Sequence, residues 1–356
     1  MAGLLEGVRV LDLSIWRPGP YATQLLVEMG ADVVKVEPPG GDPMRVFPTL
    51  FADLNAGKRS AAVDLKAPVG RAAVLERATG ADVVIEGFRP GVAARLGVGE
   101  VDVRAVNPTV VYCSISGYGQ GGPLVAAAGH DINYQAWAGV LEPLADGGEP
   151  VVARPPIADL AGGAYAAMAV CAALVRRGRT GEGESIDVAM TDVLASWTGA
   201  VPPLTQPDGR RLGGRVTGYG LYRARDGWIT LGVLTEDHLW AALVGALGLD
   251  DVADLDFAAR TARVDDLEGR LQAAVADQPR DELVDTLLAA GVPAAPVLTQ
   301  SEMLTGPALR GRGTVVSGPD GGPMVRHPVH YRDHPATTPL DVPALVEGEP
   351  QVPAWR

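Results

Sequence analysis

Short apolar runs alternate with helical segments through the first half of the chain, and this alternation constrains the fold more than any other feature. The runs are rich in valine and leucine and lie at 8–14, 33–36, 61–65, 83–86, 110–114 and 184–189. Helical segments are expected at 18–30, 68–79, 90–96 and 158–177. Because neighbouring parallel strands need a helical crossover between them, the pattern predicts an α/β fold with a doubly wound parallel sheet. Ligands of such folds bind beyond the carboxyl ends of the strands.

The length of the chain indicates two lobes. Its 356 residues exceed the usual size of one hydrophobic core. Pro202-Pro203 and the polar run that continues to 215 are typical of a linker. We therefore expect a large lobe over 1–200 and a smaller α+β lobe over 216–322, followed by a segment at 323–356 with no clear period. The small lobe is expected to contain a turn at Asp226-Gly227 and helices at 239–247, 266–275 and 281–290.

The charge of the chain argues against nucleic acid and anionic membranes as partners. The formal net charge is −13 and the sequence pI is about 4.8, so the chain as a whole repels phosphate backbones. Basic residues nevertheless gather in one short stretch, namely Lys58, Arg59, Lys66, Arg89 and Arg95. This local reversal of sign is suited to an anionic small molecule.

Cysteine and histidine usage indicates neither disulfides nor metal. Cys113 and Cys171 lie far apart in apolar runs and form no C-x-x-C pair. His327, His330 and His334 lie in a proline-broken tail without the ligand spacing of a zinc site. The first residues have no basic region followed by an apolar core, and no apolar run approaches membrane-spanning length. We expect a cytoplasmic protein without a membrane partner.

Two side chains stand out as an acid/base pair. His130 lies in Gly-His-Asp-Ile-Asn-Tyr at 129–134, and Asp159 lies in Pro-Pro-Ile-Ala-Asp-Leu-Ala-Gly-Gly at 155–163. Histidine has the unperturbed side-chain pKa closest to neutral, so it can accept or donate a proton there. Taken singly, His130 also fits an ordinary exposed histidine and Asp159 a helix N-cap. The glycines from Gly117 satisfy G-x-G-x-x-G, but Pro123 follows and no helix opens, which favours a glycine turn over a dinucleotide site.

A series of segments in order resembles the class III CoA-transferase family and, within it, the alpha-methylacyl-CoA racemase branch. Among them are Leu5-Glu-Gly-Val-Arg-Val-Leu-Asp-Leu, Gly30-Ala-Asp-Val-Val-Lys-Val-Glu-Pro and Glu86-Gly-Phe-Arg-Pro-Gly-Val. The others are 19–22, 57–66, 95–97, 117–123, 129–134 and 158–163, so that the resemblance covers most of residues 1–190.

The resemblance implies a large Rossmann-like lobe to which the C-terminal segment returns, a smaller lobe and an interlocked homodimer. It implies that an acyl-CoA is the substrate and that coenzyme A is present only as part of it, with no permanently bound cofactor. The residues that would contact CoA are Leu65, Lys66, Gly87, Phe88, Arg89, Arg95 and Tyr134. Arginine and lysine suit the phosphates of the nucleotide end.

Two chemistries follow from the resemblance. In the racemase, His130 and Asp159 would move a proton off and onto the alpha carbon of a 2-methylacyl-CoA through an enolate, with Glu236 supporting the histidine. Backbone amides in the first turn of the Asp159 helix would stabilise the enolate oxygen. In the transferases, an aspartate at the Asp159 position attacks the thioester, forms an anhydride and then carries CoA.

His130 favours the racemase, because transferases usually carry another residue before the aspartate at 131. The stretch before Asp159 lacks the Asn-Leu pair common in racemases and is less decisive. A non-catalytic CoA-binding scaffold and, more remotely, a nicotinamide-dependent oxidoreductase are the remaining alternatives.

Overall fold

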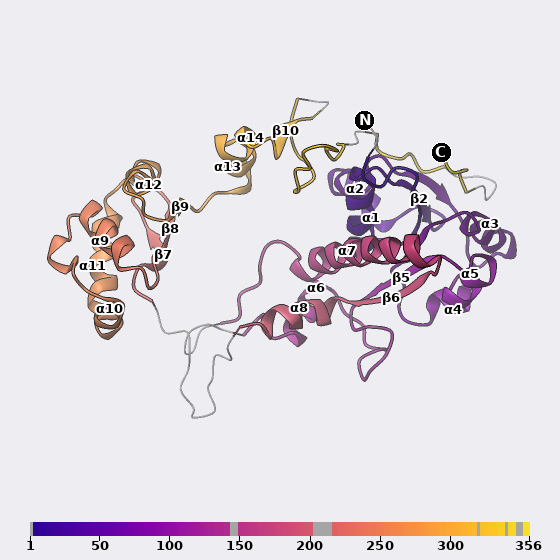
Figure 1. The fold of residues 1–356 in the computed structure, drawn as a ribbon, viewed down its shortest axis with the longest axis horizontal. Coiled ribbons are helices and arrows are strands. Elements are labelled where there is room, and N and C mark those ends of the chain that lie inside the picture. The colour runs from indigo at the N-terminus through magenta and orange to yellow at the C-terminus, as the bar shows by residue number, and fades with distance from the viewer. Residues whose placement is uncertain (1–2, 143–148, 202–215, 319–320, 339–340, 347–351) are drawn as a thin grey trace. The chain divides into compact units, whose positions relative to one another are not determined.

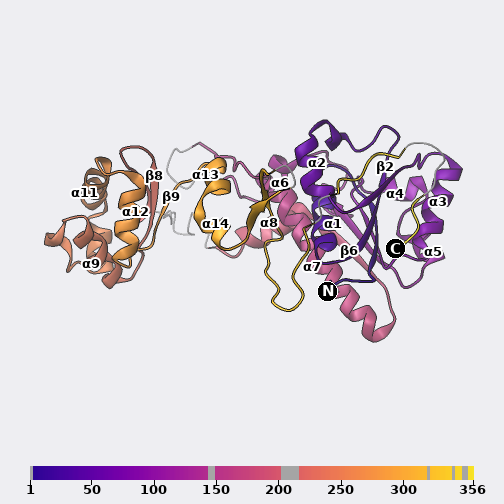
Figure 2. The ribbon, with the colours of Figure 1, turned by 90° about the horizontal axis from the view of Figure 1, so that it is seen from above.

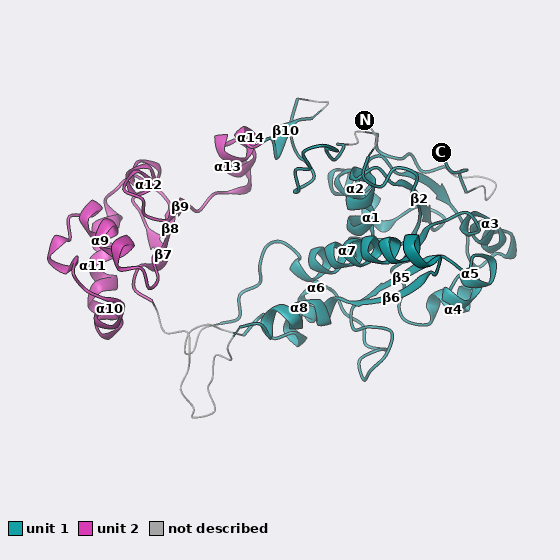
Figure 3. Ribbon diagram, in the orientation of Figure 1, with its two compact units in different colours: residues 1–143, 149–201, 313–356 teal, residues 144–148, 202–312 magenta. Residues whose placement is uncertain are grey.

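A computed structural model describes residues 3–142, 149–201, 216–318, 321–338, 341–346 and 352–356. The chain divides into two compact units (Figure 3). The first unit takes in residues 1–143, 149–201 and 313–356, and the second takes in 144–148 and 202–312. The second unit therefore ends at Arg312 rather than at the expected 322.

The first unit is built on a six-stranded parallel sheet in the order β3-β2-β1-β4-β5-β6 (Figures 1 and 2). The strands are β1 (Arg9–Leu13), β2 (Asp32–Glu37), β3 (Arg59–Ala62), β4 (Val83–Glu86), β5 (Val111–Ser116) and β6 (Glu184–Ala189). Val10 of β1 pairs with Val33 on one side and with Val83 on the other. Strands β2 and β3 follow β1 on one side of the sheet, and β4, β5 and β6 follow on the other side. The strand order therefore reverses between β1 and β4, and folds of this kind bind ligands at that switch point. The predicted doubly wound α/β fold is confirmed.

Helices connect the strands of this unit. They are α1 (Pro18–Glu28), η1 (Pro43–Val46), α2 (Pro48–Asn55), α3 (Pro68–Ala78), α4 (Val92–Leu96), α5 (Glu100–Val106), α6 (Asp131–Trp137), α7 (Ile157–Thr180) and α8 (Met190–Thr198). Proline occupies the first turn of α1, α2 and α3, where its missing N–H has no helical partner to lose. The helices predicted near 18, 68 and 158 begin within a residue of those positions.

Alternate side chains of the strands face two apolar layers. Val10 and Val83 belong to the layer that contains α1 and α7, whereas Leu11 and Val84 belong to the opposite layer. Small residues let α7 pack closely: a Cβ added at Gly163 would lie 2.5 Å from the carbonyl oxygen of Pro18 in α1. The positions of these two helices are thus fixed against each other at their N-terminal ends.

Helix α7 is long and apolar enough to cross a membrane, by length and composition alone. From the sequence, no apolar run of membrane-spanning length was expected. A core helix meets the same criteria, and the buried side of α7, which includes Ala161, Ala166 and Val170, packs in the layer between the sheet and α1.

The last part of the chain lies along the sheet-bearing unit. Strands β10 (Val315–Ser317) and β11 (Pro323–Val325) form an antiparallel pair. Further on, the backbone N–H of Gly57 donates to the carbonyl of Asp341 at 2.7 Å, and Arg77 donates to the carbonyl of Val352 at 2.9 Å. Val352 is buried in the layer on the α3 side of the sheet.

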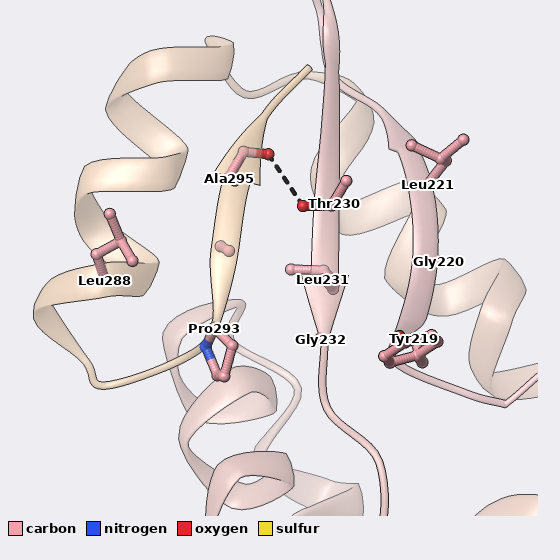
Figure 4. A pocket seen from close by; sticks show the side chains of 10 residues that line it. Tyr219, Gly220, Leu221, Thr230, Leu231, Gly232, Leu288, Pro293 and Ala295 are labelled. Carbon is pink, nitrogen blue, oxygen red and sulfur yellow. Dashed lines mark hydrogen bonds between the residues drawn. The ribbon is translucent and has the colours of Figure 1, made fainter. Parts of the chain in front are cut away.

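The second unit is an α+β structure. Strands β7 (Tyr219–Arg223), β8 (Trp228–Gly232) and β9 (Ala294–Pro296) form an antiparallel sheet, and the predicted turn at Asp226-Gly227 joins β7 to β8. Its helices are α9 (Asp237–Ala246), η2 (Asp250–Val252), α10 (Phe257–Ala262), α11 (Val264–Ala276), α12 (Arg280–Ala289), α13 (Gln300–Thr305) and α14 (Pro307–Gly311). A pocket of about 500 Å³ lies over the sheet, lined by residues such as Tyr219, Leu221 and Leu288 (Figure 4).

Candidate active site

Several candidate residues follow neighbouring strands of the sheet, at the edge where a ligand is expected. Arg17 comes after β1, Arg89 comes after β4, and Gly117 comes directly after β5. The switch point lies between β1 and β4. The loops that carry these residues therefore meet at one edge of the sheet.

The beginning of α7 is held by a side chain from another helix. The carboxylate of Asp131, the first residue of α6, accepts hydrogen bonds from the backbone N–H groups of Ala158 at 2.7 Å and Asp159 at 3.1 Å. The Gln135 amide donates to the other oxygen of the same carboxylate at 2.5 Å. Since the first N–H groups of a helix have no partner within it, Asp131 supplies the missing acceptor. Asp159 is thus not the N-cap that its position suggested.

This arrangement bears on the expected oxyanion site. The N–H groups of Ala158 and Asp159 donate to Asp131, and that of Leu160 donates to the carbonyl of Pro156 at 3.1 Å. These three first-turn amides of α7 therefore already have acceptors, which makes them less available to a substrate oxygen.

Asp159 stands in the first turn of α7 as a partly buried carboxyl. Burial and, after it, the negative charge of Asp131 raise its pKa to about 6, against the opposing effect of Arg17. Within the part of the chain that the structure describes, no hydrogen bond or ion pair holds the Asp159 side chain. The group is therefore free to react, and it is more basic than an ordinary aspartate while still mostly ionised at neutral pH.

Tyr134 forms one wall of this site. Its hydroxyl donates to the carbonyl of Gly129 at 2.6 Å, and its ring meets that of Tyr118 edge to face with centroids 5.1 Å apart. Burial and then the charge of Asp159 raise the pKa of Tyr134 to about 12, while Arg89 acts in the opposite direction. Tyr134 thus lies within electrostatic reach of both Asp159 and Arg89, and it stays neutral.

A glycine after β5 makes room for the tyrosine. Any side chain at Gly117 would collide with the ring of Tyr134. The glycine-rich stretch that begins there continues in turns and bends to residue 126, and the next helix, α6, begins only at Asp131. The glycines are therefore not followed directly by a helix, and the prediction of a glycine turn is confirmed.

His130 is exposed at the N-cap position of α6, directly before Asp131. Its backbone N–H donates to the Asn133 side chain at 3.0 Å, which fixes the start of the helix. Because Asp131 bonds to the first turn of α7, the backbone of His130 is brought close to that of Asp159. In the described residues, no hydrogen bond joins the imidazole to the Asp159 carboxyl.

The stretch of basic residues divides into two groups. Lys66, Arg89 and Arg95 are exposed, as a phosphate-binding role requires. Lys58 is instead fully buried, 3.3 Å from Asp12, and Arg59 pairs with Asp32 at 2.6 Å. Of the five basic residues that lie close together in the sequence, Lys58 and Arg59 are thus held in ion pairs with other parts of the sheet, and Lys66, Arg89 and Arg95 stay exposed.

The other residues expected to contact CoA lie around the exposed ones. Leu65 and Phe88 are partly buried and pack against the same apolar layer. The backbone N–H of Phe88 donates to Glu86 at 2.7 Å, which folds back the loop that carries Gly87 and Arg89. No group of three or more histidine, cysteine, aspartate or glutamate side chains in the described residues is arranged to hold a metal ion.

Comparison with known proteins shows the family of the chain. The family model described as CoA-transferase family III matches residues 5–349. The chain belongs to CoA-transferase family III.

Its relatives in the family include named transferases. A succinate–glutarate CoA-transferase of Agrobacterium fabrum is 33% identical, with 98% of this chain and 94% of the relative covered. An acetyl-CoA:oxalate CoA-transferase of Acetobacter aceti is also 33% identical, with 91% and 87% covered. The structure of a CaiB/BaiF family protein from Brucella suis superposes with a TM-score of 0.85 at 29% identity, covering 97% of each chain.

Glu236 of this family III chain belongs to the second unit. It is the N-cap residue of α9, and its carboxylate accepts from the backbone N–H of Leu234 at 3.0 Å. Hydrogen bonds from its own N–H and that of Leu234 lower its pKa. The structure describes Glu236 within its own unit, so its support of His130 stays a prediction.

Two residues of the site were missed by the sequence analysis. Arg17 lies between β1 and α1. Because Pro18 indicates the first residue of the helix, the sequence could have shown that Arg17 lies in the loop after a strand, at the edge of the sheet where a ligand is expected. Asp131 follows His130 in the same motif, but its role depends on a helix that begins 26 residues later, at Ile157. Only the contact between α6 and α7 makes that role visible.

Proposed function

We propose that this chain is a CoA-transferase that moves CoA between an acyl-CoA and a free carboxylic acid, with Asp159 as the nucleophile. The observation that carries the proposal is the Asp159 carboxyl, which has no hydrogen-bond partner among the described residues and whose pKa is raised to about 6 by burial and by Asp131. A carboxylate with a raised pKa is a stronger nucleophile than an ordinary one and is still ionised at neutral pH. The names of the family relatives support the same reading.

The reaction has two symmetrical halves. An oxygen of Asp159 attacks the thioester carbonyl, the C–S bond breaks, and CoA leaves as a thiolate while a mixed anhydride forms. The thiolate then attacks the Asp159 carbonyl carbon, which releases the acyl group as a carboxylate and leaves CoA on Asp159 as a thioester. The acceptor carboxylate repeats these steps in reverse and leaves as the new acyl-CoA. No net proton is consumed.

Side chains around Asp159 provide the remaining functions. Arg17 is the cation that acts on the Asp159 carboxyl, and it is suited to stabilising the negative oxygen of each tetrahedral intermediate. Tyr134 narrows the site beside it. Lys66, Arg89 and Arg95 are exposed cations suited to the phosphates of CoA.

Trapping of the intermediate tests the proposal. The protein is incubated with acetyl-CoA or succinyl-CoA and with succinate, glutarate or oxalate as acceptor, and hydroxylamine is added during turnover. We expect a hydroxamate at Asp159, detected by peptide mass, and a loss of transfer of about 10³-fold or more in Asp159→Asn. Asp192, an acid in the first turn of α8, provides the control Asp192→Asn, which should transfer normally. Undiminished transfer by Asp159→Asn would exclude the proposal.

Racemisation of a 2-methylacyl-CoA is the second candidate, and the exposed His130 beside the α7 N-terminus favours it. A chiral 2-methylacyl-CoA in deuterated water distinguishes the two. Deuterium at the alpha carbon that disappears in His130→Ala would establish the racemase, whereas full CoA transfer by His130→Ala without exchange supports the transferase. Tight CoA binding with neither reaction would indicate a scaffold. The homodimer implied by the resemblance is tested separately by light scattering.

A further inference from the structure

A fully buried ion pair is hydrogen-bonded to the turn between β1 and α1. The ammonium of Lys35 lies 2.9 Å from a carboxylate oxygen of Asp42, and both side chains are completely inaccessible to solvent. Lys35 also donates to the carbonyl of Ser14 at 2.7 Å. The other oxygen of Asp42 accepts from the backbone N–H groups of Trp16 at 3.2 Å and Met44 at 2.9 Å. One pair thus holds the chain on both sides of residue 15.

The turn that the pair contacts has an unfavourable backbone conformation at Trp16. Trp16 has a φ of +64° and is the only non-glycine residue with positive φ in the described part of the chain. A bulky residue adopts this region only where its surroundings impose it. The bonds from Lys35 and Asp42 to the flanking backbone groups supply that constraint.

The turn determines where Arg17 stands. Arg17 precedes α1, and the next residue, Pro18, contacts α7 at Gly163, where an added Cβ would lie 2.5 Å from the Pro18 carbonyl. Gly163 lies four residues after Asp159 and therefore on the same face of α7. A change in the turn would move Arg17 relative to Asp159 while the rest of the sheet stayed in place.

Stability alone does not explain the pair. Removing two charges from water costs more than a well-packed apolar pair at the same place, so a buried ion pair is weak evidence of stabilisation. Neighbouring charges are also internal: Asp12 pairs with Lys58 at 3.3 Å, and Glu37 pairs with Arg45 at 2.6 Å. Asp12 and Lys58 also bond to backbone beside the turn, at the N–H of Ser14 and the carbonyl of Pro20. What distinguishes the pair of Lys35 and Asp42 is that Asp42 accepts from the N–H of Trp16 itself, the residue with positive φ.

We infer that the buried pair of Lys35 and Asp42 is a positioning device that holds the Trp16–Arg17 turn so that the Arg17 guanidinium faces the Asp159 carboxyl. The inference rests on the proposed function for the role of Asp159. The pair contacts no substrate and acts only through Arg17.

The test is an infrared titration of the Asp159 carboxyl, with the Asp159→Asn form of each protein as the blank. Arg17→Ala should shift the titration upward, because Arg17 favours the ionised form. Asp42→Asn keeps an oxygen for Trp16 and Met44 but removes the ion pair, and we expect an upward shift of similar size. Loss of a negative charge acting directly would shift the titration downward, so the sign separates positioning from simple electrostatics.

The double variant Arg17→Ala/Asp42→Asn should show no further shift, since the effect passes through Arg17. Asp82→Asn is the matched control: it removes ion pairs with Arg9 and Arg177 at the opposite edge of the sheet and should leave the titration unchanged. If Asp42→Asn alone fails to fold, Lys35→Met/Asp42→Asn replaces it, because this variant removes both charges. We expect the same upward shift of the Asp159 titration.

An unchanged or lowered titration in folded Asp42→Asn or in the double replacement would overturn the inference. A wild-type protein that forms no hydroxamate would overturn the proposed function instead. The titration needs no turnover, so the two failures are distinguishable.

Discussion

At the scale of single residues, two aspartates near one helix end have different tasks. One oxygen of Asp131 accepts from the N–H groups of Ala158 and Asp159, while the Asp159 carboxyl has no hydrogen-bond partner in the described part of the chain. The like charge of Asp131 and burial both disfavour ionisation of Asp159, which makes that group the more basic. The division of roles follows from which side chain meets the free amides.

Asp131→Asn should lower the pKa of Asp159. The asparagine oxygen can still accept from both amides, but the repelling charge is gone. The nucleophile is the ionised form, so transfer by the wild type should rise with pH through about 6, the pKa of Asp159, and in the variant this rise should move to lower pH. The pH profile of kcat/KM measures it. Asp131→Ala also removes the cap of α7, which should lower the unfolding free energy by about 1 kcal/mol. If the rise of kcat/KM moved to higher pH in Asp131→Asn, the proposed effect of Asp131 on Asp159 would be contradicted.

Sequence reasoning located part of this site. His130, Asp159 and Tyr134 were selected from motifs, and the structure places Tyr134 within reach of Asp159. Arg17, Asp131 and the Lys35–Asp42 pair were not selected, because each acts on backbone or charge far away in the sequence. The ion pairs of Lys58 with Asp12 and of Arg59 with Asp32 were not predicted, because a basic residue near the start of a strand gives no local sign of its partner.

At the scale of elements, most of the sheet and its helices could be predicted because β1, β2, β4 and β5 are largely apolar runs of ordinary length. The strand predicted at 61–65 lies earlier in the structure, where β3 spans Arg59–Ala62 and the residues from Val63 to Leu65 are outside the strand. The start of α7 carries no capping side chain of its own at Pro156. Its cap comes from α6, and a cap of that kind cannot be recognised from the local sequence.

Gly163→Ala should separate α1 from α7. The new Cβ would lie 2.5 Å from the Pro18 carbonyl, and overpacking of this kind costs about 1–3 kcal/mol. Transfer should fall as well, because Arg17 precedes Pro18. Urea unfolding and single-turnover rates measure the two effects.

Gly178→Ala is the control on the same helix. No atom lies within 4 Å of a Cβ added there, so alanine should stabilise α7 by about 0.5–1 kcal/mol with normal transfer. A Gly163→Ala protein as stable and active as Gly178→Ala would refute the close contact.

At the scale of the whole molecule, the net charge of −13 opposes an anionic substrate that a few exposed cations must attract. Lys66, Arg89 and Arg95 can do so locally, since the Debye length at physiological salt is about 8 Å. The bulk composition therefore argues against polyanions as partners without arguing against CoA.

Arg95→Ala should raise the KM for acyl-CoA about tenfold with little change in kcat, because one charge-assisted hydrogen bond to phosphate is worth about 1.5–3 kcal/mol. The KM of the wild type should also rise with salt. Arg179, an exposed arginine at the end of α7, gives the control Arg179→Ala. Equal effects of the two substitutions would show that Arg95 has no specific role.

The order in which the sheet-bearing unit is completed has a consequence for its synthesis. Residues 202–312 interrupt that unit, and Val352, near the end of the chain, fills part of its apolar layer. When only the first two hundred residues have emerged from the ribosome, all six strands are present. Val352, which packs over them beside α3, is still missing. Nascent chains stalled before residue 352 should expose that face to chaperones, and they should resist protease only once the last residues have emerged.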